Sequence, residues 1–543
     1  MGRARDTLEG WWERLHRPLD AASLAAFRIL FGLLMAGAVV RYVQMGWIDR
    51  FYVQSDFRFT YWGFEWVKAP PEQGMYVLFA GMFVLALCVA AGLFYRFAIA
   101  AFFVVFTYVE LVDVTNYLNH YYQVSLLALI MAFLPLHRAW SLDARRRPAL
   151  RTTTFPAWMT YLLRFQVGVV YFYAALAKAG PDWLLHGQPL GLWLAARTDT
   201  PLIGPLLDLP WVALAMSWAG FLHDLLVVPA LLWRRSRPFA YAVLVVFHAA
   251  TGYFFNIGIF PFLMITTALV FFSPTWPRKL LRYLPKTRLP TLPASASEPG
   301  AERERGAEGS PRALPREGEP SEKASGAAMS GPARGERAGV GGSDEIKPER
   351  ERVGASGEIQ APPLRVPHIL GTAAVALYCL FQLVMPLRAH AYGGDVLWHE
   401  QGMRWSWRVM VREKQGSVTY HVRLPDGRST QVSPCRYLSQ RQEREMAGQP
   451  DLILQLAHRI AEDFRARGHG EVEVRAEALV SLNGRPPEPM IDSTVDLTKV
   501  SDGVAKAAWI LPAPSGAPAK LRKPSGKLGR GRMARWDGTD DAK

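Results

Sequence analysis

Cysteine is scarce in this chain: its 543 residues include only three, Cys88, Cys379 and Cys435. No C-x-x-C pair occurs, and no cysteine and histidine residues have the spacing of a zinc site. Cys88 and Cys379 also lie inside apolar segments. The sequence therefore predicts neither a disulfide framework nor a structural zinc site, and we expect no bound metal.

Aromatic residues are missing from residues 289–365, which contain no Phe, Trp or Tyr and are rich in Gly, Pro, Ala, Ser, Glu and Arg. Such a composition cannot bury enough apolar surface to offset the entropy of the chain. We expect this segment to be a disordered cytoplasmic linker that acts as a tether.

Charge is nearly absent from several long runs, of which 74–94 and 239–255 are examples. A uniform soluble globule is therefore excluded, although the mean hydropathy of the whole chain is only +0.05. Windows of about 19 residues identify apolar stretches long enough for membrane helices. The nine stretches lie near 24–43, 74–93, 97–115, 121–136, 158–177, 211–233, 239–256, 258–273 and 367–387. No A-x-A cleavage site follows the first stretch, so we expect a retained helix there.

Basic residues are concentrated in alternate loops, and the formal net charge is +15. Clusters at 138–151, 234–237 and 278–288 alternate with loops that are mixed or uncharged. An excess of Lys and Arg marks the cytoplasmic side of a membrane. This pattern predicts a cytoplasmic N-terminus in the cell (inner) membrane and places 388–543 outside. It also accounts for most of the positive charge without nucleic acid.

The region after the ninth stretch has the pattern of a folded domain. Residues 416–433 alternate around an Asp-Gly turn, which predicts a hairpin, and 451–466 have helical spacing. Residues 471–485 indicate another strand. The predicted fold is an all-α membrane bundle of about nine helices with a small C-terminal extracytoplasmic α+β domain. Its predicted parts are a cytoplasmic segment 1–20, a transmembrane catalytic domain 21–288 with about eight helices, the linker 289–365, the ninth helix 366–388, the α+β domain 389–512 and a basic disordered tail 513–543.

Polar residues within or beside apolar helices are expensive and are candidates for function. Six of them form the candidate site: Asn119, His120, Lys178, Asp224, His248 and Asn256. The predicted topology brings Asn119, His120 and Lys178 to the same side of the membrane. Each residue also has a structural alternative, such as a lysine that reaches the interface or an aspartate that pairs with a neighbouring helix. Arg28 and Arg164, near the predicted inner ends, are expected to extend toward water.

A chemical role for these residues has a physical basis. An amine in an apolar environment loses its proton more readily than one in water and can then act as a general base. A nearby histidine and an asparagine amide can donate hydrogen bonds to developing negative charge. A cavity open to lipid could admit an apolar quinol, although composition does not show which substrate enters.

Longer motifs carry a resemblance to a known family. They are FRILFGLLM (27–35), GLFYR (92–96), NYLNHYY (116–122), VVYFYAALAKAGPDW (169–183), FHAATGYFFNIGIFPF (247–262), FFSPTWPRKL (271–280), WSWRVMV (405–411), SLNGRPPEP (481–489) and AAWILP (507–512). In order and over roughly 20–285 and 366–512, the chain resembles the vitamin K-dependent gamma-glutamyl carboxylase family. This family also contains the bacterial horizontally transferred transmembrane (HTTM) domain proteins.

The resemblance implies an integral membrane carboxylase of the carbon–carbon lyase class. Reduced vitamin K, or a related quinol, would be oxygenated by O2 to the epoxide, and the strong base generated on the way would remove a γ-proton from a protein glutamate. CO2 would then add to give γ-carboxyglutamate. The implied partners are the lipid bilayer, a quinone and a glutamate-bearing protein or peptide. The protein must keep water from quenching the base.

The resemblance also assigns roles to individual residues. Lys178 matches the lysine that deprotonates the hydroquinone, His120 matches the histidine that assists at the glutamyl carbanion, and Asn119 matches an asparagine thought to bind the quinol. Asp224, His248 and Asn256 are further predicted pocket members. One departure is Ala177, where eukaryotic members have a second lysine. Two alternatives stay open, namely quinol epoxidation without carboxylation, and a non-enzymatic transporter or assembly protein. An inverted hydropathy repeat would favour the latter, and none is evident.

Overall fold

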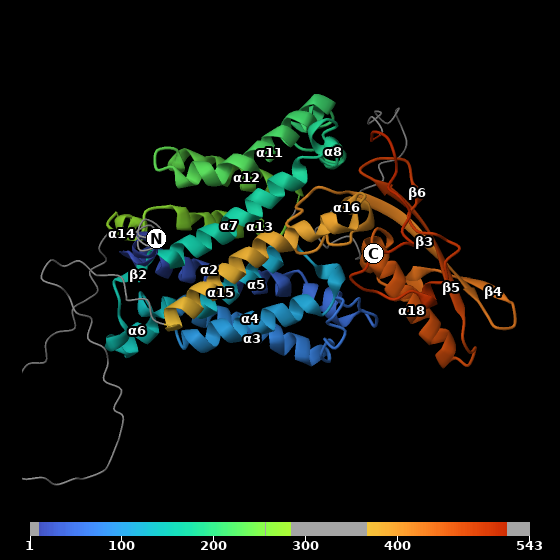
Figure 1. Cartoon of the computed structure of the whole chain (residues 1–543), viewed down its shortest axis with the longest axis horizontal. Coiled ribbons are helices and arrows are strands. Elements are labelled where there is room, and N and C mark those ends of the chain that lie inside the picture. Colours follow the sequence, from blue (N-terminus) through green and yellow to red (C-terminus); the bar gives the residue numbers. More distant parts are fainter. Residues whose placement is uncertain (1–9, 256, 284–365, 519–543) are drawn as a thin grey trace, which may run out of the picture. The chain divides into compact units, whose positions relative to one another are not determined.

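The computed structural model describes residues 10–255, 257–283 and 366–518, and each predicted apolar stretch forms a helix in it (Figure 1). The nine helices are α2 (Ala22–Gln44), α3 (Glu72–Ala91), α4 (Tyr95–Leu111), α5 (Asn119–Phe133), α7 (Ala157–Lys178), α11 (Pro210–Leu232), α12 (Arg237–Phe255), α13 (Phe260–Ala268) and α15 (Val366–Val384). The predicted linker lies outside the described residues, as do 519–543 of the predicted tail.

Six helices in the described part of the chain are long and apolar enough to cross a membrane. They are α2, α3, α7, α11, α12 and the helical run Leu370–Tyr392. The other three are shorter: α4 has 17 residues, α5 has 15, and α13 has 9 before it continues as the 3-10 turn η5 (Leu269–Phe271). The chain is thus a mostly helical membrane protein, and its helix lengths do not confirm the predicted count of about nine spans.

The helices pack closely because small residues lie where two backbones meet. A Cβ atom placed on Gly32 of α2 would lie 2.5 Å from the backbone nitrogen of Ala90 in α3. Helices in membranes associate through such small-residue contacts. The helix after the linker joins the same bundle, since the Tyr378 hydroxyl of α15 donates to Oε1 of Gln166 in α7 at 2.6 Å.

Arg28 corrects one sequence-based expectation. Its side chain is fully buried rather than extended toward water. Its guanidinium donates to the carbonyls of Val89 and Ala90 at the end of α3, at 2.8 and 2.9 Å, and to Trp140 at 2.6 Å. The last carbonyls of a helix lack partners within the helix, so a cation that binds them satisfies these groups without water.

The C-terminal region contains a four-stranded antiparallel sheet in the order β4-β3-β5-β6 (Figure 1). Its strands are β3 (Lys414–Arg423), β4 (Ser429–Val432), β5 (Glu473–Leu482) and β6 (Glu488–Pro489), and α17 (Gln440–Ala447) and α18 (Pro450–Ala466) accompany them. Arg423 pairs with Ser429 across the Asp-Gly turn. The predicted hairpin, helix and second strand are therefore confirmed.

Alternate residues of β5 are buried, which gives the sheet one apolar face. That face packs on α18, whose apolar residues recur at helical spacing, and Leu456 and Ile460 are fully buried there. The domain thus has a hydrophobic core, as the period-two and helical patterns predict, and Phe59, Tyr61 and Val114 from the N-terminal part of the chain also belong to it. The three cysteines, all within the described residues, are free.

Candidate functional site

The site is organised around Lys178, the last residue of α7. Its Nζ lies 2.8 Å from Oδ2 of Asp224 on α11, and both side chains are only 6% exposed. Removing two charges from water costs several kcal/mol per ion, so a buried pair needs close geometry and further hydrogen bonds. The structure therefore brings together two of the six predicted residues, in a contact that their sequence positions do not reveal.

Two backbone carbonyls complete the surroundings of the Lys178 amine. Nζ lies 3.4 Å from the carbonyl of Ala174, one helical turn earlier, and 3.2 Å from that of Val409. The Trp183 ring centroid is 5.4 Å from Nζ. In its ammonium form this side chain has three donors, and Asp224, Ala174 and Val409 supply three acceptors. The amine is thus held in one orientation, with its last acceptor supplied by the C-terminal region.

A pocket opens beside this amine. Small-molecule sites are mostly apolar with a few polar groups, and the lining of this pocket has that character. The polar side chains of the lining are Lys178, Asp224, His248, Tyr171 and Thr251. The rest of the lining is Val170, Ala174, Trp183, Leu190, Met216, Gly220, Phe247, Phe255, Phe260, Met264, Val409 and Met410. Such a lining suits an aromatic or aliphatic ligand that carries one or two polar atoms.

His248 lies in the wall of this pocket. Its Nε2 is 2.7 Å from the Tyr171 hydroxyl, and its buried Nδ1 has no hydrogen-bond partner among the described residues. The neighbouring His223 instead stacks on Phe247, with ring centroids 3.9 Å apart. Of these two histidines, His248 is the one with a side chain in the pocket lining.

His120 and Asn119 begin α5 and do not line the Lys178 pocket. His120 is 6% exposed, and its Nε2 is buried without a partner in the described structure. The ring of Phe260, which lines the pocket, is near both predicted histidines, with centroids 5.8 Å from His120 and 5.4 Å from His248. His120 is therefore next to a ring of the pocket lining without lining the pocket itself, and predicted Asn256 lies outside the described residues.

Asn119 is linked to Lys178 through the backbone of the C-terminal region. Its Nδ2 donates to the carbonyl of Arg408 at 3.3 Å, and its Oδ1 accepts from the Tyr117 hydroxyl at 3.0 Å. The next carbonyl along the chain, that of Val409, contacts Lys178. Two predicted site residues from separate helices thus contact consecutive carbonyls of one segment.

Sequence reasoning missed the part played by this segment. Residues 404–414, which we call the covering segment, pass over the pocket through Val409 and Met410. Trp405, Trp407 and Met410 have φ angles of 59°, 57° and 55°, a left-handed conformation that non-glycine residues seldom adopt. Such residues persist only where their surroundings fix them, often at functional sites. The motif WSWRVMV marks the segment, but nothing in its pattern predicts contact with Lys178.

Two family models match the chain. The HTTM domain matches residues 16–276, and the lumenal domain of the vitamin K-dependent gamma-carboxylase matches residues 368–516. The chain belongs to the gamma-glutamyl carboxylase family. No solved structure gives a significant match.

The pocket beside Lys178 is built from residues of both matched domains. Lys178, Asp224 and His248 lie in the first match, and Val409 and Met410 lie in the second. The match to a lumenal domain indicates that the C-terminal region of this membrane protein is extracytoplasmic. No cluster of three or more His, Cys, Asp or Glu side chains suited to a metal ion occurs within the described residues.

Proposed function

We propose that this chain is a membrane enzyme in which Lys178 deprotonates a reduced quinone, and that oxygenation of the quinol is coupled to carboxylation of a protein glutamate. The observation that carries the proposal is the buried Lys178 amine, held by Asp224 at the wall of an apolar pocket. Membership of the carboxylase family supports the reaction class.

The pocket residues fit a reduced vitamin K or related quinol. Aromatic and aliphatic side chains, Phe247 and Phe260 among them, offer surfaces for an apolar ring. Lys178, Tyr171 and His248 bring polar atoms to the same lining, and in this proposal they are the partners of the ring hydroxyls. When bound and oxygenated by O2, the quinol supplies the strong base that removes a γ-proton from glutamate before CO2 adds.

The residues around Lys178 have separable roles in this proposal. The proposed step requires the neutral form of the Lys178 amine. The proton that this amine accepts from the quinol gives the ammonium, and the Asp224 carboxylate stabilises that charge where water is excluded. The carbonyl of Val409 orients the same amine. The Nε2 of His120, which has no partner among the described residues, is assigned to a reacting anion in this proposal, and the Asn119 amide lies at the same end of α5.

We also infer the arrangement in the cell membrane. The basic loops support a cytoplasmic N-terminus, an extracytoplasmic C-terminal domain and about nine spans, in which α4, α5 and α13 would be short. Residues 289–365 would then be a cytoplasmic tether between the eighth and ninth spans. Attaching a reporter to each terminus and testing its accessibility from either side of the membrane checks this orientation.

The decisive experiment uses the purified full-length chain in nanodiscs with reduced vitamin K, O2, labelled bicarbonate and a glutamyl peptide. Labelled CO2 in the peptide and epoxide formation are measured in the same tube, and we expect both. Lys178→Ala should lower both rates by at least about 100-fold, as expected for loss of a general base. Lys279→Ala, at an exposed lysine outside the pocket, is the matched control and should not change either rate.

The same assay separates the alternatives. Epoxide without labelled CO2 would select a quinol oxygenase and overturn the carboxylation step. Absence of any quinol turnover, together with transport in vesicles, would select a non-enzymatic membrane protein. If Lys178→Ala kept full activity, the proposed mechanism would be wrong.

A further inference from the structure

A tight turn in the C-terminal domain presents two side chains to the membrane bundle. Asn483 and Gly484 follow β5 with φ angles of 51° and 82°, and the Arg485 amide donates to the carbonyl of Leu482 at 3.0 Å. Two consecutive residues of positive φ define the hairpin turn for which Asn-Gly is the preferred sequence. The turn therefore fixes the direction in which Asn483 and Arg485 extend.

Both side chains bind Asp182, four residues after Lys178. Arg485 donates from Nη2 to Oδ1 at 2.6 Å and from Nη1 to Oδ2 at 2.7 Å, and Asn483 Nδ2 donates to Oδ2 at 2.8 Å. The side chains of Arg485 and Asp182 are 12% and 18% exposed. A bidentate pair that is largely removed from water is strong and has a defined geometry. We call the contact between Asp182, Asn483 and Arg485 the latch.

The latch is directly connected to the covering segment. Asn483 is fully buried. Its side-chain Oδ1 accepts from the backbone N–H of Glu413, and its backbone N–H donates to the Glu413 carbonyl, both at 2.8 Å. The Glu413 side chain accepts from Trp193 Nε1 at 2.7 Å. Glu413 lies only three residues after Met410, which lines the pocket. Side-chain contacts and short stretches of chain thus form a closed ring. The chain leads from Lys178 to Asp182, Asp182 binds Asn483, and Asn483 binds Glu413. The chain then leads from Glu413 back to Val409, whose carbonyl contacts Lys178.

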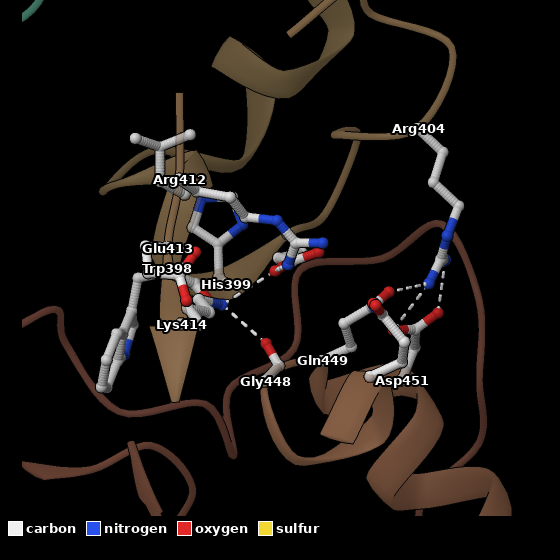
Figure 2. Close-up of polar contacts among 12 residues, drawn as sticks. Trp398, His399, Arg404, Arg412, Glu413, Lys414, Gly448, Gln449 and Asp451 are labelled. Carbon is white, nitrogen blue, oxygen red and sulfur yellow. Dashed lines mark hydrogen bonds and ion pairs between the residues drawn. The ribbon is translucent and has the colours of Figure 1, made fainter. Parts of the chain in front are cut away.

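The covering segment is also anchored at both of its ends (Figure 2). Arg404 donates to Asp451 at 2.6 Å and to Gln449 at 2.5 Å. Lys414 donates to the carbonyls of Trp398 and Gly448 at 2.6 and 2.7 Å. Because these contacts lie within the C-terminal region, the segment should move with that domain as one body. Its position over Lys178 therefore depends on where the domain is held, together with the direct contacts that Asn119 and Tyr117 make with its backbone.

We propose that Asp182 and Arg485 are positioning residues, and that the latch between them holds the covering segment over Lys178. The latch lets the Val409 carbonyl orient the amine and lets Val409 and Met410 close the pocket on that side. The chemical role of the oriented amine rests on the proposed function above. The position of the covering segment is independent of that function, so the latch and the proposed function can be tested separately.

Backbone hydrogen exchange of the full-length chain in nanodiscs measures that position directly. Asp182→Asn and Arg485→Gln should each raise exchange in residues 405–413 by about tenfold or more, the loss expected when charge-assisted hydrogen bonds between largely buried groups are broken. The central strands β3 and β5 should exchange as in the unchanged protein, which shows that the domain is still folded. Arg465→Gln removes an exposed pair with Glu471 in the same domain, and it should leave 405–413 unchanged.

The double variant Asp182→Asn/Arg485→Gln should exchange no faster than either single variant, because both changes break one contact. Unchanged exchange in 405–413, additive effects of the two changes, or faster exchange throughout β3 and β5 would each overturn the proposal. None of these measurements requires enzyme activity.

A second measurement connects the latch with catalysis. In both single variants the amount of CO2 fixed per epoxide formed should fall by about twofold or more, because water that enters an opened site quenches the base. A ratio equal to that of the unchanged protein would overturn the positioning role. If the unchanged protein turned over no quinol, the proposed function would fail, while the exchange result would still decide the latch.

Discussion

Lys178 and Asp224 lie 46 residues apart on different helices, with 2.8 Å between Nζ and Oδ2. Each was a separate candidate in the sequence, and each had a structural explanation. Their contact changes the physical problem, because a buried charge is tolerated when its partner is present and costly when the partner is removed. The pair should therefore affect stability and chemistry in different ways, and variants can separate the two.

Removing only one member of this pair should destabilise the protein strongly. Asp224→Ala leaves the Lys178 amine buried without its carboxylate, at a cost of about 3–5 kcal/mol. The double variant Lys178→Met/Asp224→Leu removes both charges and should recover most of that loss, although it should be inactive. Thermal unfolding in detergent compares the variants, with Arg465→Gln as a surface control. A double variant as unstable as Asp224→Ala would contradict this account of the pair.

His120 should be needed for carboxylation and not for quinol oxygenation. Its side chain does not line the Lys178 pocket, so His120→Ala should leave quinol deprotonation largely intact. We expect epoxide formation to stay within about threefold of the unchanged protein while labelled CO2 incorporation falls by about 100-fold, the typical contribution of a positioned acid or base. Equal losses of epoxide and labelled CO2 would assign His120 to the quinol step instead.

The membrane helices and the small sheet could be predicted because their signals are local. Apolar windows of about 19 residues identified each of the nine helices, and the Asp-Gly turn at 426–427 identified the hairpin. Helix lengths were less predictable, since α13 ends where Leu269 starts a 3-10 turn. Arg28 was wrongly expected to reach water, because sequence position does not show that the open end of α3 lies beside it.

The site could be predicted only in part, because its contacts join residues that are far apart in the sequence. Loop charges placed Lys178 and Asn119 on one side of the membrane, and the structure connects them through the carbonyls of Arg408 and Val409. Those carbonyls belong to a segment 231 residues from Lys178 in sequence. Such long-range contacts depend on how each helix is rotated and on tertiary packing, neither of which periodicity determines.

The latch should be insensitive to pH until the solution is strongly acidic. Burial tends to raise the pKa of the Asp182 carboxyl, but hydrogen bonds from Arg485 and Asn483 outweigh it and hold the pKa below its usual 3.8. Because the pKa is lowered in the folded protein, the ionised Asp182 carboxylate stabilises the latch fully above pH 3.8. This stabilisation is lost as the pH falls through the lower pKa of the folded state. Protection of 405–413, corrected for intrinsic exchange, should therefore decline only below about pH 4. In Asp182→Asn the decline should be absent, and loss of protection already near pH 5 would contradict the assignment.

The contact between α2 and α3 provides a stability test that is independent of the site. In Gly32→Ala, the new Cβ would lie 2.5 Å from the backbone nitrogen of Ala90 and 2.6 Å from the carbonyl oxygen of Ala86, so the helices must separate. We expect a loss of about 1–3 kcal/mol, the usual cost of overpacking a close contact. Gly37→Ala is the matched control on the same helix, because nothing lies within 4 Å of its added Cβ. That change should be neutral or slightly stabilising, since alanine favours the helix. Equal unfolding temperatures for the two variants would show that α2 and α3 do not approach as closely as the structure has them.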